Sequence, residues 1–351
     1  MEFGVAFASK VGDFGHVALA ESLGFDHAWF FDSQMIYSDV YATMALAAHH
    51  TSSIRLGTGV AVPTTRIAPT IAHSIATVAQ LAPGRVELGV GTGNTARLTM
   101  GCRPISLTVM KREIAIIRKL LRGEEAMLEV DGELHPVKLL HPHRGFIDIS
   151  QPIPISVSAF GPKTLAYCGA ESDGHITWGL GPREMRDTRK ALDEAARAAG
   201  RQAADVPSKG IFPLAVLGAG ESSASPRVLR SLESFITNFL HVQVEWGEDL
   251  LKAEGPIAEW IERYREHTSS LPKERAHLTL HEGHLVYARD DEREFIVPEL
   301  AEAVAMIGEP DALIERIRAL EDAGLKQFAF QVTDDPKRQI EDFARAVIER
   351  Y

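Results

Sequence analysis

Residues 3–31, FGVAFASKVGDFGHVALAESLGFDHAWFF, contain one complete strand–helix–strand unit. The run at 3–7 is short and apolar, as in a strand, and 13–23 has the apolar spacing of a helix that Gly24 ends. A second apolar run follows at 27–31. A helix placed between two such strands predicts a βαβ unit whose strands are parallel.

This unit repeats along the chain. Further strands are predicted at 54–62, 86–90, 153–158, 175–180, 211–217 and 327–332, with helices at 40–50, 68–81, 162–170, 182–199 and 336–350. Several strands, 86–90 among them, are almost continuously apolar, which is typical of strands covered on both faces. Eight strands joined by helices predict an α/β fold of the (β/α)8 TIM-barrel class, because a doubly wound sheet usually has fewer strands.

Two connections are too long for a plain barrel, and they predict insertions at about 94–151 and 218–325. The first holds a helix at 108–121 and then Asp131-Gly132 between alternating runs, which is a hairpin signal. The second is mostly helical, and its acidic segment 301–321 is interpreted as a solvent-facing helix. We expect one domain over 1–351, in which the second insertion covers the site.

Composition narrows the possible partners and the compartment. The chain has 351 residues with 37 Lys+Arg and 48 Asp+Glu, a net charge of −11, and no basic run suited to nucleic acid. Its two cysteines, Cys102 and Cys168, cannot build a disulfide framework. No signal peptide and no apolar stretch of about 18 residues is apparent, so we expect a cytoplasmic protein with no membrane contact.

A glycine-rich segment follows the fourth predicted strand. Gly91-Thr92-Gly93-Asn94-Thr95-Ala96 fits the G-x-G-x-x-G/A pattern, in which glycines let a pyrophosphate approach the backbone. The segment belongs to the fourth unit of the series and not to the first, as a dinucleotide site would. We therefore expect contact with another cofactor here, while a purely structural turn stays open as the alternative.

Other strand ends carry polar or glycine-rich residues. Gly161-Pro162-Lys163 begins a helix, and free amides at a helix start can hold a phosphate, although an ordinary capped helix is equally consistent. Two glycines, Gly57 and Gly59, indicate a bulge or a close backbone approach. Asp32-Ser33-Gln34 ends the second strand, where polar residues of a barrel face the active site, unless they only form a turn.

Histidines give no clear metal site. His281 and His284 have a helical ligand spacing, but no carboxylate stands at an obvious third position, so we expect hydrogen-bonded histidines and no metal. The hydrolase and phosphate-loop motifs GxSxG and GxxxxGK[ST] do not occur in the chain.

Taken in order, these strand ends resemble the luciferase-like flavin oxidoreductases, a superfamily that includes bacterial luciferase, flavin-dependent monooxygenases and deazaflavin-dependent reductases. The resembling segments are 24–32, 56–60 with Arg66 and Pro69, 84–93, 158–163 with 172–174, and 308–321. The resemblance implies a TIM barrel that binds its flavin at the carboxyl ends of the strands. It also implies a non-prolyl cis peptide at Gly59–Val60, against the flavin ring.

The resemblance further assigns the site residues. The residues expected to bind the cofactor are Asp32, Gly59, Val60, Thr92, Gly93, Ser158, Ala159, Gly161, Pro162, Lys163 and Trp178. Among them, the helix start at 161–163 would hold the flavin phosphate. Ser33, Gln34 and Asn94 are the candidate catalytic residues, with Tyr37 as a further polar contact near the reactive edge.

The chain also departs from known members. Several deazaflavin reductases have Asp-His where this chain has Asp32-Ser33, and some have an acid where it has Asn94; those groups donate protons there. The arginine that grips the phosphate in luciferase corresponds to Thr92, so light emission is not expected.

The resulting expectation is an FMN-dependent monooxygenase that uses reduced flavin and oxygen on a small organic substrate. In that chemistry the cofactor reacts, and the protein contributes shape, hydrogen bonds and exclusion of water. Two alternatives stay open: a reductase that uses the deazaflavin coenzyme F420 to transfer hydride, and a non-catalytic flavin-binding protein. A flavin reductase partner and a homo-oligomer are implied by resemblance alone.

Overall fold

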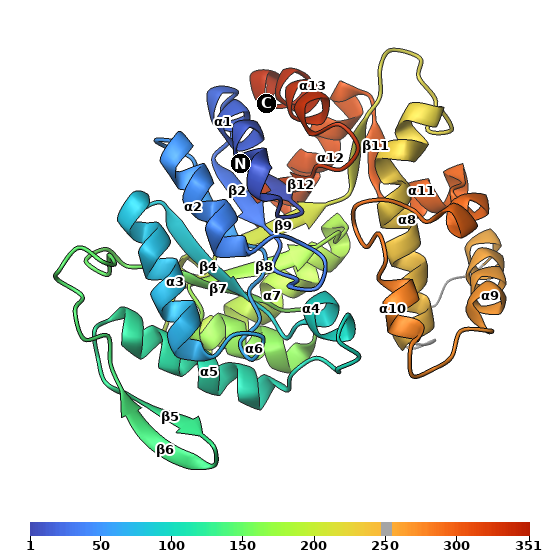
Figure 1. The fold of residues 1–351 in the computed structure, drawn as a ribbon. Helices are drawn as coiled ribbons and strands as arrows, with labels where there is room; N and C mark the ends of the chain where they lie inside the picture. Colours follow the sequence, from blue (N-terminus) through green and yellow to red (C-terminus); the bar gives the residue numbers. More distant parts are fainter. Residues whose placement is uncertain (247–254) are drawn as a thin grey trace.

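The computed structural model describes residues 1–246 and 255–351. Eight parallel strands close into a barrel in the order β1-β12-β9-β8-β7-β4-β3-β2, and helices surround it (Figure 1). The predicted (β/α)8 TIM barrel is therefore confirmed.

The barrel strands are β1 (Glu2–Phe7), β2 (His27–Phe30), β3 (Arg55–Thr58), β4 (Val86–Val90), β7 (Ile155–Ser158), β8 (Gly174–Trp178), β9 (Ser208–Phe212) and β12 (Leu325–Gln331). The helices around them are α1 (Phe14–Ser22), α2 (Val40–His50), α3 (Ala68–Leu81), α5 (Leu107–Leu121), α6 (Pro162–Glu171), α7 (Pro182–Ala198), α12 (Pro310–Asp322) and α13 (Pro336–Ala346). A short helix, α4 (Asn94–Leu98), follows β4.

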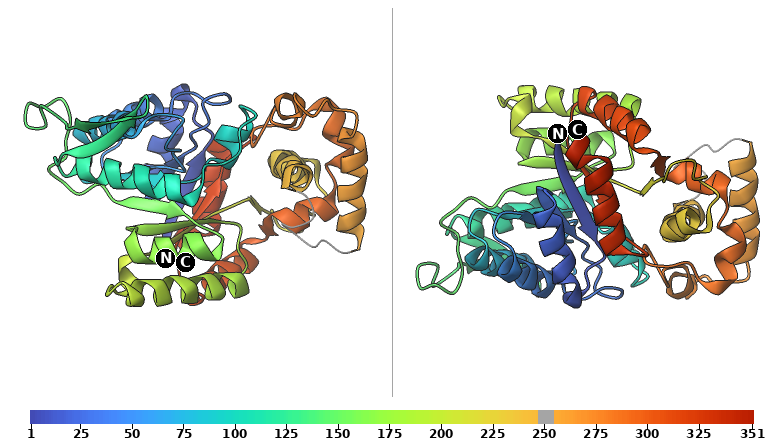
Figure 2. Two further views of the ribbon diagram at one scale, coloured as in Figure 1. Left: turned by 90° about the horizontal axis from the view of Figure 1, so that it is seen from below. Right: turned by 90° about the horizontal axis from the view of Figure 1, so that it is seen from above.

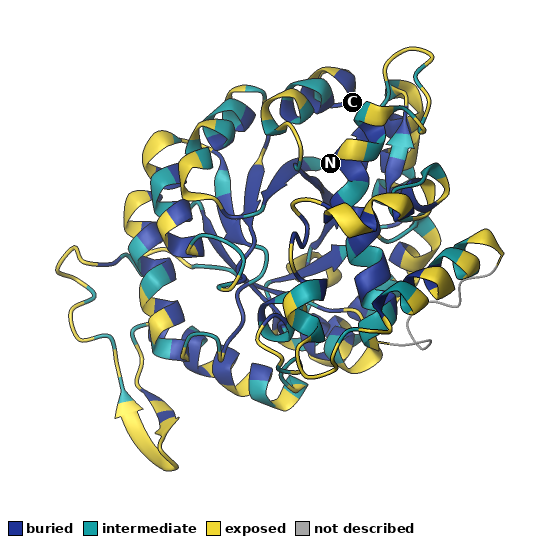
Figure 3. Cartoon of the chain, turned by 45° about the vertical axis from the view of Figure 1, so that its right-hand side comes forward, coloured by how far each residue is buried: buried dark blue, intermediate teal, exposed yellow. Residues whose placement is uncertain are grey.

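Burial explains why these strands are apolar throughout. All five residues of β4 are buried, because one face of the strand meets the barrel interior and the other meets the helices. The barrel strands are buried, and the helices turn exposed residues outward (Figure 3). Proline in the first turn begins several helices, α6, α7 and α12 among them, where the missing amide hydrogen costs no hydrogen bond.

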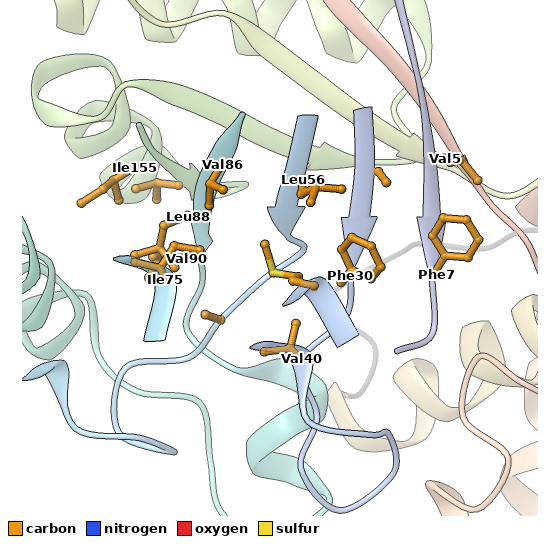
Figure 4. Packing of buried hydrophobic residues seen from close by; sticks show 14 of the residues in the cluster. Val5, Phe7, Phe30, Val40, Leu56, Ile75, Val86, Leu88, Val90 and Ile155 are labelled. Carbon is orange, nitrogen blue, oxygen red and sulfur yellow. The ribbon is translucent and has the colours of Figure 1, made fainter. Parts of the chain in front are cut away.

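The main core lies between the barrel and its helices. Figure 4 shows Phe7 and Phe30 on neighbouring strands and Leu56 on the next strand along the sheet. The rings of Phe7 and Phe30 stack with centroids 5.8 Å apart. Fully burying a side chain of this size stabilises the fold by about 1.5–3 kcal/mol. A second apolar cluster fills the carboxyl end of the barrel and continues into the second insertion.

The first insertion contains the predicted hairpin. Strands β5 (Ala126–Val130) and β6 (Glu133–Val137) pair antiparallel around Asp131 and Gly132, whose φ angles are +53° and +82°. Positive φ at both central residues matches the type I′ turn that Asp-Gly favours. The hairpin projects away from the barrel (Figures 1 and 3).

The second insertion forms a helical group on one side of the barrel (Figure 2). It contains α8 (Pro226–Trp246), α9 (Pro256–Thr268), α10 (Ala276–Leu280) and α11 (Pro298–Val304). Two short parallel strands, β10 (Leu214–Val216) and β11 (Met306–Gly308), pair with each other outside the barrel sheet at the start and end of this insertion. The prediction of one domain remains a prediction.

Three predicted elements are wrong in their bounds. The strand expected at 211–217 is divided at Pro213, which has no amide hydrogen, and only β9 belongs to the barrel. The helix expected at 301–321 is interrupted by β11, and Pro310 begins a new helix. The strand expected at 54–62 ends at Thr58, just before a cis peptide bond at Gly59–Val60.

Across residues 1–246 and 255–351, no helix is both long enough and apolar enough to cross a membrane.

Candidate active site

An ion pair braces the carboxyl rim of the barrel, where the strands end. Nη1 of Arg66 donates to both carboxylate oxygens of Asp32, at 2.8 and 2.6 Å, and Nη2 donates to Oδ2 of Asp39 at 2.7 Å. Burial raises the pKa of Asp32, and the hydrogen bonds and charge of Arg66 oppose that rise. The Asp32 carboxylate thus ties the segment after β2 to the segment after β3.

The cis peptide bond that the resemblance implies is present between Gly59 and Val60. The amide of Gly59 donates to the carbonyl of Phe30 at 2.7 Å, and Ala61 resumes pairing with β4. A Cβ atom on Gly91 would lie 2.6 Å from Cγ2 of Val60, so the end of β4 needs glycine there to admit this side chain. The ends of the two neighbouring strands, β2 and β4, therefore hold the Gly59–Val60 segment in place.

Two helix starts lie side by side on the rim. Gly161-Pro162-Lys163 begins α6, Gly181-Pro182-Arg183 begins α7, and these two helices pack against each other. The amides of Gly161 and Lys163 donate to no acceptor among the described residues. A Cβ on Gly161 would meet no atom within 4 Å, so the backbone is open to a ligand. Free amides at a helix start attract an anion such as a phosphate.

His175 supports this rim from below. Its Nε2 lies 2.9 Å from the carbonyl of Ala159, and its Nδ1 lies 3.2 Å from the Ser208 hydroxyl. Burial lowers the pKa of His175 to about 4, even though its bond to Ala159 works in the opposite direction. The ring is therefore neutral at pH 7, and it donates to Ala159 while accepting from Ser208.

Aromatic rings line the boundary between the rim and the second insertion. The centroid of Trp178 lies 6.2 Å from that of Phe31 and 6.3 Å from that of Phe235 on α8. Phe31 is also 6.4 Å from Tyr37. These rings keep water away from one side of the rim.

The predicted catalytic residues lie where the second insertion meets the rim. Gln34 donates to the carbonyl of Ala96 at 3.0 Å, and Oδ1 of Asn94 accepts from the Trp246 indole at 3.0 Å. Ser33 is buried, and its carbonyl accepts the amide of Tyr37. The structure thus brings Gln34 and Asn94 together at α4, although their catalytic roles stay a prediction.

The remaining expected cofactor residues divide between two parts of the rim. Thr92 and Gly93 follow β4, Ser158 ends β7, and Lys163 is exposed at the start of α6. Gly93 has a φ of +86°, which favours glycine. That these residues bind a cofactor also stays a prediction.

Sequence reasoning missed the contacts made by the second insertion. The Tyr37 hydroxyl donates to the carbonyl of His284 at 2.9 Å, and Nε2 of Gln331 donates to the carbonyl of Leu285 at 2.8 Å. The side chains of Thr95 and His284 are also 3.0 Å apart. The only advance signal was the His281-x-x-His284 spacing, which did not reveal these partners. Within the described ranges, no group of three potential metal ligands occurs.

Several known proteins are similar to this chain. It is 36% identical over 213 residues to a 5,10-methylenetetrahydromethanopterin reductase of Methanolobus tindarius, covering 59% of this chain and 63% of the relative. It is 34% identical over 207 residues to an F420-dependent glucose-6-phosphate dehydrogenase of Kineococcus radiotolerans, covering 55% and 59%. The matches therefore span less than two thirds of these curated relatives.

Solved structures share the whole fold. The coenzyme F420-dependent tetrahydromethanopterin reductase from Methanopyrus kandleri superposes with a TM-score of 0.71 at 20% identity, over 100% of this chain and 99% of the other. The oxygenating constituent of 3,6-diketocamphane monooxygenase from Pseudomonas putida, solved with FMN, gives 0.62 at 18% identity, over 100% and 98%. At such identities the likeness shows the fold alone.

The family model for luciferase-like monooxygenases matches residues 14–327, which is most of the chain and contains six of the eight barrel strands completely. Together with the closed barrel, this match confirms the resemblance drawn from the strand ends. The chain belongs to the luciferase-like monooxygenase family.

Proposed function

We propose that this protein is a coenzyme F420-dependent oxidoreductase that transfers hydride to or from a small organic substrate. The observation that carries the proposal is the chemistry named in the relatives at 34% identity, an F420-dependent glucose-6-phosphate dehydrogenase and an F420-dependent hydroxymycolic acid dehydrogenase. Two structural neighbours solved with FMN or modified FMN are 18% and 13% identical to this chain. The relatives thus favour the deazaflavin alternative over the FMN monooxygenase that we expected first.

The rim fits a phosphorylated deazaflavin in two respects. The open backbone at Gly161, with its free amides, suits the phosphate, and Lys163 adds a positive charge. At the other side, Gly59 and Val60 present a short apolar surface next to Gly91, which suits a flat ring. We assign these residues to the cofactor.

When bound, the deazaflavin supplies or accepts a hydride. The chain then has three tasks. Asp32 and Arg66 hold the segments on which the ring would rest, Trp178 and Phe31 would exclude water, and a polar group must accept or supply the proton that accompanies hydride transfer. Ser33 stands where several deazaflavin reductases carry a histidine, and Asn94 where some carry an acid, so the proton must use another route in this chain.

Binding of the purified protein to oxidised coenzyme F420 and to reduced FMN tests the proposal, with each titration run in air and without air. We expect saturable binding of F420, and its reduction by glucose 6-phosphate or 2-propanol without oxygen. Binding of reduced FMN alone, with turnover that requires oxygen, would show that the monooxygenase interpretation was right. Homo-oligomer formation remains a prediction that the same preparation can test by light scattering.

A further inference from the structure

A chain of hydrogen bonds runs from the second insertion to the rim. Nε2 of His281 lies 2.7 Å from Oε1 of Glu245, and Nδ1 of His281 lies 3.4 Å from Nδ1 of His284. Nε2 of His284 then lies 3.0 Å from the hydroxyl of Thr95. Four side chains from α8, the segment after α10, and α4 thus form one continuous path.

When both rings are neutral, the acceptors along this path determine which nitrogen of each ring carries the proton. A carboxylate only accepts, so Nε2 of His281 carries the proton toward Glu245. Nδ1 of His281 is then an acceptor, and Nδ1–H of His284 donates to it. Nε2 of His284 is left to accept from the Thr95 hydroxyl. Every donor has an acceptor in this arrangement.

The two histidines in the middle of the path are buried, and its two ends are partly exposed. The side chain of His281 is 4% exposed, while that of Glu245 is 12% exposed and can exchange protons with water. Burial holds the pKa of His284 well below its ordinary value, which keeps this ring neutral.

The segment that carries His284 is fixed to the rim at two further points. The carbonyl of His284 accepts from Tyr37, which follows β2, and the carbonyl of Leu285 accepts from Gln331, the last residue of β12. Thr95 itself follows Asn94, whose side chain is bound by Trp246. The end of the path is therefore held beside the residues expected at the reactive edge.

The site residues expected from the sequence do not provide a route for the proton that accompanies hydride transfer. Among the site residues expected from the sequence, only Asp32 and Lys163 have acidic or basic side chains, and the Asp32 carboxylate is occupied by Arg66. Hydride transfer to or from an alcohol carbon must move one proton as well.

We infer that His281 and His284 relay this proton between the Thr95 hydroxyl and Glu245. This inference rests on the proposed F420 chemistry and identifies the substrate class as an alcohol or its carbonyl product. In the oxidative direction, the substrate C–H bond breaks and its electron pair leaves as hydride to the coenzyme, so the carbinol is oxidised and the coenzyme is reduced.

The proton moves at the same time. The substrate hydroxyl proton passes to the oxygen of Thr95, whose own proton passes to Nε2 of His284. The Nδ1 proton of His284 passes to Nδ1 of His281, and the Nε2 proton of His281 passes to the Glu245 carboxylate. The reverse sequence supplies a proton for carbonyl reduction. His281, His284 and Glu245 act through Thr95, so they are positioning and relay residues.

The first test needs neither cofactor nor substrate. Nitrogen-15 NMR of the histidine-labelled protein at pH 7, assigned with His281→Asn and His284→Asn, reports which ring nitrogen carries the proton. We expect both rings neutral, with the proton on Nε2 of His281 and on Nδ1 of His284. A cationic His281, or the opposite tautomer of either ring, overturns the relay.

The second test uses turnover of F420 with 2-propanol or glucose 6-phosphate. Thr95→Val keeps the side-chain shape but removes the hydroxyl, and we expect kcat to fall by roughly 100-fold with little change in the Kd for F420. Thr95→Ser should recover most of kcat, and Glu245→Gln should behave like Thr95→Val. An unchanged kcat in Thr95→Val, or no rescue by serine, contradicts the relay.

A matched control is available in the same insertion. His241 and His281 are both buried, and Nε2 of His241 lies 2.7 Å from Glu292, the same distance as in the Glu245 pair, but Nδ1 of His241 has no hydrogen-bond partner among the described residues. We expect His241→Gln to lower stability but to leave kcat near the wild-type value. A loss of kcat as large as in Glu245→Gln would mean that any damage to the insertion slows turnover, and the relay would be rejected.

The two proposals fail in different ways. If the wild-type protein reduces F420 and Thr95→Val matches it, the relay is wrong and the proposed function stands. If the wild-type protein neither binds nor reduces F420, the proposed function is wrong and the relay falls with it. If F420 binds but neither alcohol reacts, nitrogen-15 NMR of the F420-bound protein decides whether the relay stands. The tautomers expected above support the relay, and any other tautomer rejects it.

Discussion

The indole Nε1 of Trp246 donates a 3.0 Å hydrogen bond to Oδ1 of Asn94, which joins the last residue of α8 to the first residue of α4. Both residues are exposed, so the bond is worth little to the fold as a whole. Its effect is local, because it holds the second insertion to the segment that carries a predicted catalytic residue.

A double-mutant cycle with Trp246→Phe and Asn94→Ala measures this bond. We expect an interaction energy of about 0.5–1 kcal/mol in the free energy of unfolding, because the partners are neutral and solvent competes for them. Urea unfolding of the four proteins gives the value. Strict additivity of the two single changes would show that the bond is not formed in solution.

The Asp32–Arg66 pair predicts a larger effect. Replacing Arg66 by methionine leaves a buried carboxylate beside Asp39, and we expect a loss of about 3–5 kcal/mol in the free energy of unfolding. The double variant Asp32→Asn/Arg66→Met should recover part of this loss, because it no longer buries an unpaired charge. A double variant that is less stable than Arg66→Met would rule out this explanation.

Two glycines on the rim predict opposite outcomes. Gly91→Ala places a methyl group 2.6 Å from Val60 and should cost about 1–3 kcal/mol of stability. Gly161→Ala meets no protein atom within 4 Å at a φ of −83°, so the fold should be unaffected or stabilised by up to about 1 kcal/mol.

Binding separates the roles of these glycines further. If the phosphate of F420 lies against Gly161, the added methyl group should weaken F420 binding about tenfold, or about 1.4 kcal/mol, in a titration of Gly161→Ala. Unchanged affinity in this well-folded variant would move the phosphate to another part of the rim.

His175 predicts how stability depends on pH. Its pKa is about 4 in the folded protein, below the ordinary value of 6.5, so the unfolded chain binds the proton first as the pH falls. The contribution of His175 is therefore complete above about pH 6.5 and is lost progressively toward pH 4, by about 3 kcal/mol in all.

The measurement for His175 is a comparison of slopes. Free energies of unfolding between pH 4 and 7 should rise less steeply with pH in His175→Gln than in the wild type, by up to about 1.4 kcal/mol per pH unit. Other buried histidines contribute to both slopes equally, so parallel curves would show that His175 does not titrate in this range.

Local sequence patterns were sufficient to predict the strands and helices of the barrel. The predicted helices at 40–50 and 68–81 coincide with α2 and α3, because each has its own apolar face and a defined start. The strand β11 and its pairing with β10 could not be predicted, because each strand has three residues and the two lie some ninety residues apart. Pairing at such a distance leaves no periodic signal in either segment.

The site was predictable to the same extent. The cis peptide at Gly59–Val60 was expected from the family resemblance, and the helix start at Gly161 from its own glycine and proline. The contacts of the second insertion join residues far apart, 189 positions for Thr95 and His284. Histidine spacing showed two neighbours on one segment, but the partners that orient them come from tertiary packing.

The pairing of β12 with both β1 and β9 has a consequence for synthesis of the protein. While a ribosome is still translating the second insertion, β1 and β9 present unpaired edges. The first strand, β1, lacks one of its two partners until the last strand, β12, has been made. Exposed strand edges promote association between nascent chains. We therefore expect chains stalled before residue 325 to aggregate or to occupy chaperones, whereas chains that have released β12 do neither.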